Sequence, residues 1–216
     1  MTATRLIVFA RRPVLGRVKS RLAATLGAER ALAAYRQLLD AAIALAEASG
    51  ADRLEMRLAD DGPPQDTRDT PASPEAWALP SVLAARGWRV APQSGADLGE
   101  RMHEALSQAL SAGERPVLIG SDCPSLSPPD IAAAFAALDR ADAVFAPTED
   151  GGYALVGLSR PTPTLFESMP WSTAEVADRT RQRAAEAGLR LAWLRTVWDV
   201  DVEADLRRWE AQGGHG

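Results

Sequence analysis

The amino-acid sequence predicts an α/β protein in which helices cover both faces of a mostly parallel central sheet. Apolar runs of strand length alternate with longer segments of helical periodicity, which is the pattern of a three-layer α/β/α fold. The chain has 216 residues, of which 46% are hydrophobic. This composition can bury one substantial core, so residues 1–216 are expected to form a single domain.

In the first half of the chain, apolar spacing separates strands from helices. Leu32, Tyr35, Leu38 and Ile43 recur at near-helical intervals, and the polar, proline-rich stretch 60–75 indicates a long exposed loop. In order, we expect a strand at 5–10, a helical stretch from about Val18 that Gly50 closes, a strand at 53–59, a helix ending near Arg86, a strand at 88–92 and a helix over Leu98–Ala112.

The second half continues the alternation. Ser127, followed by proline and then Asp130, is a typical helix start, and Ser172 with Glu175 has the spacing of a capping box. In order, we expect a strand at 116–121, a helix over 127–138, strands at 142–147 and 153–158, a helix begun by the Ser172–Glu175 box, a strand at 190–197 and a final helix through Trp209.

The loop after the first strand carries a cluster of positive charge. Its cations are Arg11, Arg12, Arg17, Lys19 and Arg21, and Lys19 is the only lysine in the chain. The loop has neither the G-x-G-x-x-G of a dinucleotide site nor the glycine and lysine spacing of a Walker loop. Gly16 would let the backbone approach a ligand, and the following helix start would attract anions, so a diphosphate site is expected. Solvated surface charge is the alternative.

The overall charge restricts the partners. Asp and Glu number 29 against 24 Lys and Arg, for a net charge of -5, which disfavours nucleic acid and anionic membranes and suits a small anionic ligand. No segment approaches about 18 consecutive apolar residues, and Cys123 is the only cysteine. A cytoplasmic location is therefore expected. No residue pattern specifies an oligomeric state.

Carboxylates follow several of the later strands. Asp122 follows the strand at 116–121, Glu149 and Asp150 follow the strand at 142–147, and Asp199 and Asp201 follow the strand at 190–197. Parallel strands end at one edge of a sheet, where α/β proteins bind their ligands. Carboxylates opposite a basic loop predict a hard divalent cation, Mg²⁺ or Mn²⁺, that bridges protein oxygens to phosphate oxygens.

Six stretches in order along residues 9–206 resemble a known family. They are FARRPVLGRVKSRLA, GADLGERM, IGSDCPSL, PTEDGGYALVGL, PWST and DVDVEADL. Together they are similar to the radical-SAM/selenodomain-associated transferase 1 family of nucleotide-diphospho-sugar transferases, some of which have been linked to arsenosugar glycosyl transfer. The resemblance implies a GT-A-like fold. Where the superfamily's last motif has Thr-Pro, this chain has Val202 and Glu203.

The resemblance also implies roles for individual residues. Lys19, Asp122 and Asp150 are the expected catalytic residues, and Asp122 and Asp201, with Asp199, are the expected metal ligands. The residues expected to bind the nucleotide are Arg11, Pro13, Gly16, Lys19, Arg21, Leu98, Gly99 and Arg101, although Arg101 also fits an ordinary helix surface. The residues expected to bind the acceptor are Glu149, Asp150, Gly151, Gly152, Tyr153 and Trp171. The glycines also fit a tight turn, and the tryptophan also fits the core or a lid.

Three functions fit these residues. The first is transfer of a sugar from a nucleotide-diphospho-sugar donor to a small-molecule acceptor, with the metal and Lys19 stabilising the departing diphosphate. The second is nucleotidyl transfer from a nucleoside triphosphate to a phosphorylated small molecule, with release of pyrophosphate. The third is a nucleotide-binding module without turnover. The carboxylates argue against the third, because binding alone does not need so many.

Overall fold

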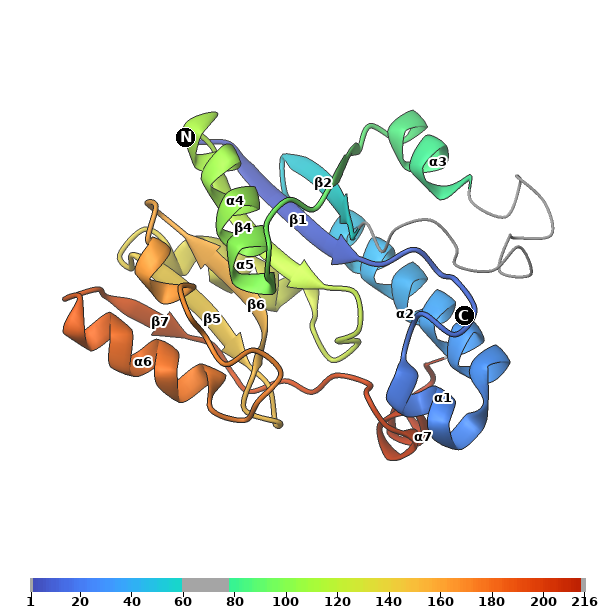
Figure 1. The fold of residues 1–216 in the computed structure, drawn as a ribbon. Helices are drawn as coiled ribbons and strands as arrows, with labels where there is room; N and C mark the ends of the chain where they lie inside the picture. The colour runs from blue at the N-terminus through green and yellow to red at the C-terminus, as the bar shows by residue number, and fades with distance from the viewer. Residues whose placement is uncertain (1, 60–77, 215–216) are drawn as a thin grey trace.

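In the computed structural model, which describes residues 2–59 and 78–214, seven strands form one sheet (Figure 1). The strands are β1 (Thr4–Ala10), β2 (Arg53–Leu58), β3 (Arg89–Pro92), β4 (Arg115–Gly120), β5 (Ala143–Pro147), β6 (Tyr153–Leu158) and β7 (Leu191–Trp193). Their order is β3-β2-β1-β4-β6-β5-β7. Only β6 runs against its neighbours β4 and β5, so the mostly parallel sheet is confirmed.

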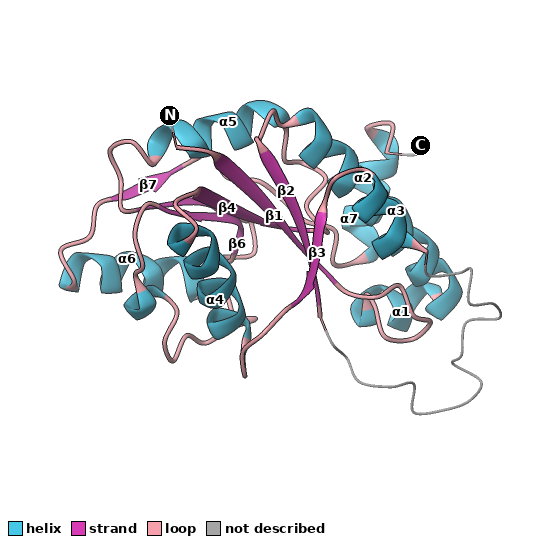
Figure 2. Cartoon of the chain, turned by 90° about the horizontal axis from the view of Figure 1, so that it is seen from above, coloured by secondary structure: helices cyan, strands magenta, loops and turns pink. Residues whose placement is uncertain are grey.

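Helices cover both faces of this sheet. They are α1 (Ser20–Leu26), α2 (Ala28–Ala48), α3 (Leu79–Ala85), α4 (Leu98–Ser111), α5 (Pro128–Ala137), α6 (Val176–Glu186) and α7 (Glu203–Ala211). Seen from above, α2 and α5 lie over one face, and α4 and α6 lie over the other (Figure 2). The predicted three-layer arrangement is therefore confirmed.

The two faces of the sheet are separated by alternation along the strands. In β1, Leu6 and Val8 belong to the core under α2 and α5, whereas Ile7 and Phe9 belong to the core under α4 and α6. Successive side chains of a strand point to opposite faces, so a fully apolar strand fills both cores. The apolar runs that the sequence analysis predicts as buried strands therefore lie in the central sheet, between the two cores.

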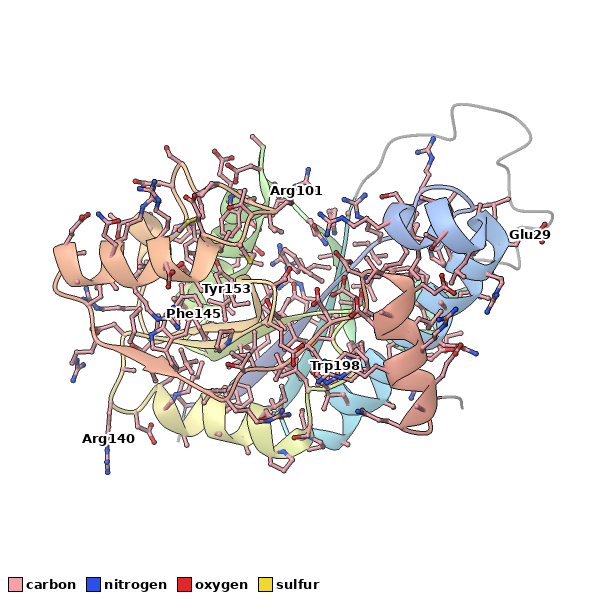
Figure 3. The ribbon with its side chains drawn as sticks, turned by 90° about the horizontal axis from the view of Figure 1, so that it is seen from below. Glu29, Arg101, Arg140, Phe145, Tyr153 and Trp198 are labelled. Atoms are coloured by element: carbon pink, nitrogen blue, oxygen red, sulfur yellow. The ribbon has the colours of Figure 1, made fainter. Side chains whose placement is uncertain are left out.

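A third apolar cluster joins the two ends of the chain. Leu22 of α1, Leu38 of α2 and Trp209 of α7 are buried together with Trp198, which lies beside α7 in Figure 3. Because α7 packs on α1, the segment that precedes α7 is held next to the segment that precedes α1. Residues 199–201 are thereby placed close to residues 19–21.

The first long helical stretch is interrupted. It was expected from about Val18 to Gly50, but α1 begins at Ser20 and the helix breaks at Gly27, which has φ 83° and ψ 155°. These angles lie outside the helical region and are open mainly to glycine. The break lets α1 turn toward α7, so the correction affects the site directly.

The capping box expected at Ser172 and Glu175 is wrong. Helix α6 begins at Val176, Glu175 is its N-cap, and Ser172 has φ 65° in the preceding turn. The last strand is also shorter than expected, because β7 ends at Trp193. Arg195 there turns away to bind Asp130 and the carbonyl of Ser125, and pairing resumes only at the bridge between Thr148 and Val197.

The loop expected at 60–75 lies outside the described residues. Among the helices of residues 2–59 and 78–214, none combines the length and the apolar character that a membrane span requires.

Candidate functional site

A cavity of about 720 Å³ opens at the carboxyl ends of the strands, as expected for this class of sheet. The carboxyl ends of β1 and β4 and the amino end of the antiparallel β6 line it, together with the basic loop of residues 11–21 and the start of α4. Twelve of the predicted site residues line it: Arg11, Lys19, Arg21, Leu98, Arg101, Asp122, Asp150, Gly152, Tyr153, Trp171, Asp199 and Asp201.

Lys19 lies at the charged centre of the cavity. Its Nζ is 2.9 Å from Asp122 Oδ2 and 3.2 Å from Asp201 Oδ1, and its side chain is only 6% exposed. Arg21 binds the second oxygen of Asp201 at 2.9 Å. Burial alone would lower the pKa of Lys19, but the two carboxylates outweigh this effect and raise it. The ammonium is therefore charged and fixed between both aspartates.

Hydrogen bonds between two loops hold these aspartates together. The amide of Val200 donates to the carbonyl of Asp122 at 2.9 Å. Ser125 Oγ donates to the carbonyl of Trp198 at 2.6 Å and accepts from its amide at 2.8 Å. The loops after β4 and β7 are thus joined side by side, although about 75 residues of sequence separate them.

Cys123 fills space beneath the same loops. It is buried, its Sγ donates to the carbonyl of Trp198 at 3.1 Å, and burial raises the pKa of its thiol to about 12. A thiol with this pKa stays protonated and is a poor nucleophile near neutral pH.

Tyr35 holds the start of the basic loop. The amide of Arg11 donates to Tyr35 Oη at 2.7 Å, and this hydroxyl donates to the carbonyl of Arg11 at 2.9 Å. Tyr35 comes from α2 and is 3% exposed. At the other end of the loop, Lys19 has φ 50° and ψ 53°, in the left-handed region that glycine and asparagine favour. The loop is fixed at both ends by contacts to the folded core.

Replacing Tyr35 with phenylalanine is expected to weaken donor binding more than the chemical step. The change removes both hydrogen bonds to the Arg11 backbone from a buried position and should cost about 1–3 kcal/mol of stability. Because the loop carries most of the lining cations but none of the predicted acceptor residues, we expect KM for the donor to rise several-fold while kcat changes less. Steady-state kinetics measure this division, and an unchanged KM with a reduced kcat would contradict it.

Asp199 has an unusual protonation equilibrium. Its pKa is raised to about 7, first by burial and then by the negative charges of Asp122, Asp150 and Asp201. Its carboxyl therefore holds a proton at pH values where an exposed aspartate is ionised. Asp199 thus belongs to a group of neighbouring carboxyls in the cavity, with Asp122, Asp150 and Asp201.

Replacing Asp199 with asparagine is expected to stabilise the metal-free protein at pH 8 and to change it little at pH 4. The folded pKa near 7 lies above the ordinary value of 3.8, so the stabilising contribution of the protonated carboxyl is complete below pH 4 and is lost as the pH rises through 7. After a discount for solvent screening, the gain at pH 8 is about 1–2 kcal/mol. Tm in EDTA measures it, and an equal gain at both pH values would contradict the assignment.

The wall opposite the basic loop holds the predicted acceptor residues. Asp150 Oδ1 accepts from Thr148 Oγ1 and, at 3.1 Å, from the amide of Gly152. Tyr153 packs its ring edge-on against Phe145, which lies next to it in Figure 3, and against Trp171 at 6.2 Å between centroids. The Tyr153 hydroxyl and the Trp171 indole N–H are buried without a partner among the described residues.

Five predicted site residues do not line the cavity: Pro13, Gly16, Gly99, Glu149 and Gly151. Glu149 is an exposed residue that forms a two-point ion pair with Arg208 at 2.8 and 3.1 Å. Gly16 has φ 75° and faces open space. The structure therefore assigns Glu149 a contact with α7 and Gly16 a role in the loop turn.

The other two glycines make room for the chain itself. A Cβ on Gly99 would lie 2.6 Å from the ring of Trp171, and one on Gly151 would lie 2.2 Å from the carbonyl oxygen of Ala174. Both distances are far below van der Waals contact. Gly99 is needed for packing of the indole, and Gly151 for packing of the turn before α6.

Sequence reasoning missed several residues that line the cavity. Tyr35 was treated as part of the apolar stripe of a helix, and Gln93, which directly follows the strand expected at 88–92, was given no role. Gln93 donates its amide hydrogens to the carbonyls of Ala10 and Arg57, so it joins the ends of β1 and β2. Thr148, which directly precedes the predicted Glu149 and Asp150, was also missed. A polar residue just past a strand end was the available signal for Gln93 and Thr148.

The carboxylate oxygens around Lys19 suit a hard divalent cation. Asp122 and Asp201 are already held close enough to share one ammonium, and burial together with the negative charges of Asp122, Asp150 and Asp201 raises the pKa of Asp199 beside them. A divalent cation prefers oxygen ligands of this kind and would favour the ionised form of these carboxyls. As the side chains stand, no three Asp, Glu, His or Cys groups converge on a metal position within the part of the chain that the structure describes, because Lys19 lies between two of the aspartates.

Solved structures share the fold. A crystal structure from Desulfovibrio desulfuricans G20, provisionally described as a nucleotide-diphospho-sugar transferase, is 30% identical, has a TM-score of 0.76 and covers 94% of this chain and 84% of its own. A nucleotidyl transferase from Methanothermobacter is 13% identical, with a TM-score of 0.60 and 97% of both chains covered. Rv0371c of Mycobacterium tuberculosis H37Rv, in complex with manganese, is 19% identical, with a TM-score of 0.51, and covers 96% of this chain and 97% of its own. The last two show the fold alone.

No curated protein matches the chain. The profile of the family described as "Uncharacterized protein conserved in bacteria (DUF2064)" matches residues 44–173, which include Asp122, Asp150 and Tyr153. Together with the 30% identity to the Desulfovibrio protein over 94% of the sequence, this match shows that the chain belongs to the DUF2064 family.

Proposed function

We propose that this protein is a metal-dependent glycosyltransferase that uses a nucleotide-diphospho-sugar donor and a small-molecule acceptor. The observation that carries the proposal is the meeting of the basic loop and the aspartates in one cavity, with Lys19 Nζ 2.9 Å from Asp122 and 3.2 Å from Asp201. A diphosphate needs both cations and a metal to neutralise its charge as it leaves. The provisional description of the Desulfovibrio protein supports the same class.

The proposed metal ligands are Asp122 and Asp201, with Asp199 beside them. They would hold Mg²⁺ or Mn²⁺, which acts as a Lewis acid on diphosphate oxygens. The manganese bound to Rv0371c supports a divalent ion at this fold. In this chain a metal would compete with the Lys19 ammonium for the same carboxylate oxygens, since that ammonium now binds both aspartates.

The rest of the donor site follows from the cavity walls. Arg11, Lys19 and Arg21 on the basic loop and Arg101 on α4 supply the positive charge for the diphosphate. Arg101 Nε donates to the carbonyl of Gly95 at 3.1 Å, which directs its guanidinium toward the connection between β3 and α4. Leu98, which is exposed in the cavity wall, is the proposed contact for the base or ribose.

The remaining wall is the proposed acceptor site, formed by Asp150, Gly152, Tyr153 and Trp171. The resemblance of six ordered motifs to the radical-SAM/selenodomain-associated transferase 1 family supports glycosyl transfer over nucleotidyl transfer. The nucleotidyl transferase from Methanothermobacter, at 13% identity, supports only the shared fold.

A thermal-shift panel tests the proposed donor. A ligand at a hundred times its Kd stabilises by about 2.7 kcal/mol, which is about 5–10 °C in Tm for a chain of this size. We expect this shift for one or more nucleotide-diphospho-sugars when Mg²⁺ or Mn²⁺ is present, and a much smaller shift in EDTA. Stabilisation by nucleoside triphosphates alone, with none by nucleotide-sugars, would contradict the proposed donor.

A further inference from the structure

We propose that the acceptor wall, defined as Thr148, Asp150, Gly152, Tyr153, Trp171 and Ser172, binds an uncharged polyhydroxyl acceptor and excludes phosphate esters. The inference rests on the proposed function, which assigns the half of the cavity beside the basic loop and α4 to the donor. Its basis is the charge of the wall and the two unpartnered polar groups in it.

Among residues 2–59 and 78–214, the positive charge that lines the cavity lies in the donor half. Of the five cations among the described lining residues, four belong to residues 11–21, and the fifth is Arg101. On α4, Gly99 faces Trp171, whereas Arg101, two positions later, lies on another side of the helix and binds the carbonyl of Gly95. Figure 3 shows Arg101 well apart from Tyr153. Among its six described residues, the acceptor wall contains no cation and one carboxylate, Asp150.

Two polar groups in this wall need partners. The hydroxyl of Tyr153 and the indole N–H of Trp171 are buried with no hydrogen bond to the described residues, and their rings meet nearly at right angles, at 86°. Buried polar groups are rarely left unpaired, because they lose their hydrogen bonds to water and gain no hydrogen bond within the protein to offset this free-energy cost. Burial also raises the pKa of Tyr153, so its hydroxyl stays protonated and serves as a neutral donor and acceptor.

A small rotation of either side chain would open its polar atom to the cavity, where sugar and polyol hydroxyls match these groups. Each hydroxyl can accept from the Trp171 N–H and can either donate to or accept from the Tyr153 hydroxyl, while aromatic faces pack against the C–H side of a sugar ring. A phosphate ester would instead bring about two negative charges to a wall whose only charge is the Asp150 carboxylate. With no cation to pair it, such a group would be desolvated at a large cost.

The proposed transfer step forms one bond, breaks one bond and moves one proton. The acceptor oxygen forms a bond to the anomeric carbon of the donor, and the bond from this carbon to the diphosphate oxygen breaks. The diphosphate leaves with the electron pair, and the acceptor proton passes to the Asp150 carboxylate. Asp150 lies in the same wall as Tyr153 and Trp171, so an acceptor bound there has a proton acceptor beside it.

Matched probes measure the charge preference of the wall independently of turnover. Saturation-transfer NMR is recorded with glucose and glucose 6-phosphate, and with glycerol and glycerol 3-phosphate, on protein saturated with Mg²⁺ and a nucleoside diphosphate. The nucleotide occupies the donor half, so a phosphate probe cannot report on the basic loop. We expect signal from the neutral probe of each pair and little from its phosphate ester.

Variants locate the binding. Tyr153→Phe and Trp171→Phe each remove one polar group and should weaken the binding of the neutral probe about five- to tenfold. Trp193→Phe is the control, because Trp193 stacks on Phe145 from β7 and does not line the cavity. In the free protein, Tyr153→Phe should keep or raise Tm, since the lost hydroxyl has no partner within residues 2–59 and 78–214. A purely structural tyrosine would instead give a lower Tm.

The outcomes separate this inference from the proposed function. Neutral probes that bind and respond to Tyr153→Phe support the acceptor assignment even if no nucleotide-sugar is consumed, in which case the proposed function fails alone. Phosphate esters that bind as well as or better than their neutral partners would overturn the acceptor assignment. So would probe binding that neither variant changes.

Discussion

Asparagine in place of Asp122 reduces turnover by about a hundredfold or more, to a level close to abolition, while the fold is retained. Asp122 lies at the carboxyl end of the central strand β4, and its carboxylate is a proposed metal ligand. The substitution removes the negative charge of this ligand. Lys19 keeps Asp201 as a partner at 3.2 Å, so the buried ammonium is not left alone. Activity assays and Tm measurements on the purified variant check both parts of the expectation.

Asp139→Asn is the matched control for this change. Asp139 also pairs with a cation, Arg115 at 2.7 Å, but it is 60% exposed and lies outside the cavity. We expect normal turnover from it. Full activity in Asp122→Asn, or in wild-type protein with excess EDTA, would show that the metal assignment is wrong.

Lys19→Ala lowers kcat/KM at least ten- to a hundredfold. The change removes the proposed contact between the Lys19 ammonium and a phosphate of the donor, and a charge-assisted contact of this kind contributes about 1.5–3 kcal/mol. The structure adds a geometric reason why Lys19→Arg should not restore the loss. The side chain is 6% exposed between two carboxylates, and a planar guanidinium needs more room and a two-point partner. Without nucleotide, Lys19→Ala should also bind Mn²⁺ more tightly, since the competing ammonium is gone.

Arg21 provides the comparison within the same loop. It binds Asp201 at 2.9 Å, but its side chain is 63% exposed. We expect a smaller loss from Arg21→Ala than from Lys19→Ala. If Lys19→Arg behaves as wild type and Arg21→Ala carries the whole loss, the phosphate contact belongs to Arg21, and Lys19 serves only to hold the aspartates.

The strands and the edge of the sheet were predictable because they depend on local pattern. The apolar runs are long enough to be buried on both faces, and carboxylates that follow parallel strands must meet at one edge. Asp122 and Asp201 were therefore expected at this edge from the sequence, and both line the cavity there although 79 positions separate their numbers. Their direct contact with Lys19 depends on how α7 packs on α1, which no local pattern encodes.

Residues whose role depends on distant partners were missed for the same reason. Tyr35 occupies an ordinary apolar helix position, and only the fold shows its hydroxyl binding both backbone groups of Arg11. In β2, Glu55 and Arg57 alternate with apolar residues as if they faced water. They are instead buried, where Arg57 binds Glu55 and also Glu104 of α4. Periodicity indicates which side of a strand is polar, but it does not show that another charged helix covers that side.

The most direct test is to follow the phosphorus products by ³¹P NMR. The protein is incubated with Mg²⁺ and a neutral polyol acceptor, in parallel with nucleotide-diphospho-sugars and with nucleoside triphosphates plus a phosphorylated acceptor. We expect a nucleoside diphosphate to appear from the nucleotide-sugar, and to be absent with EDTA and with Asp122→Asn. Pyrophosphate released from a nucleoside triphosphate, with no nucleoside diphosphate formed from any nucleotide-sugar, would contradict glycosyl transfer.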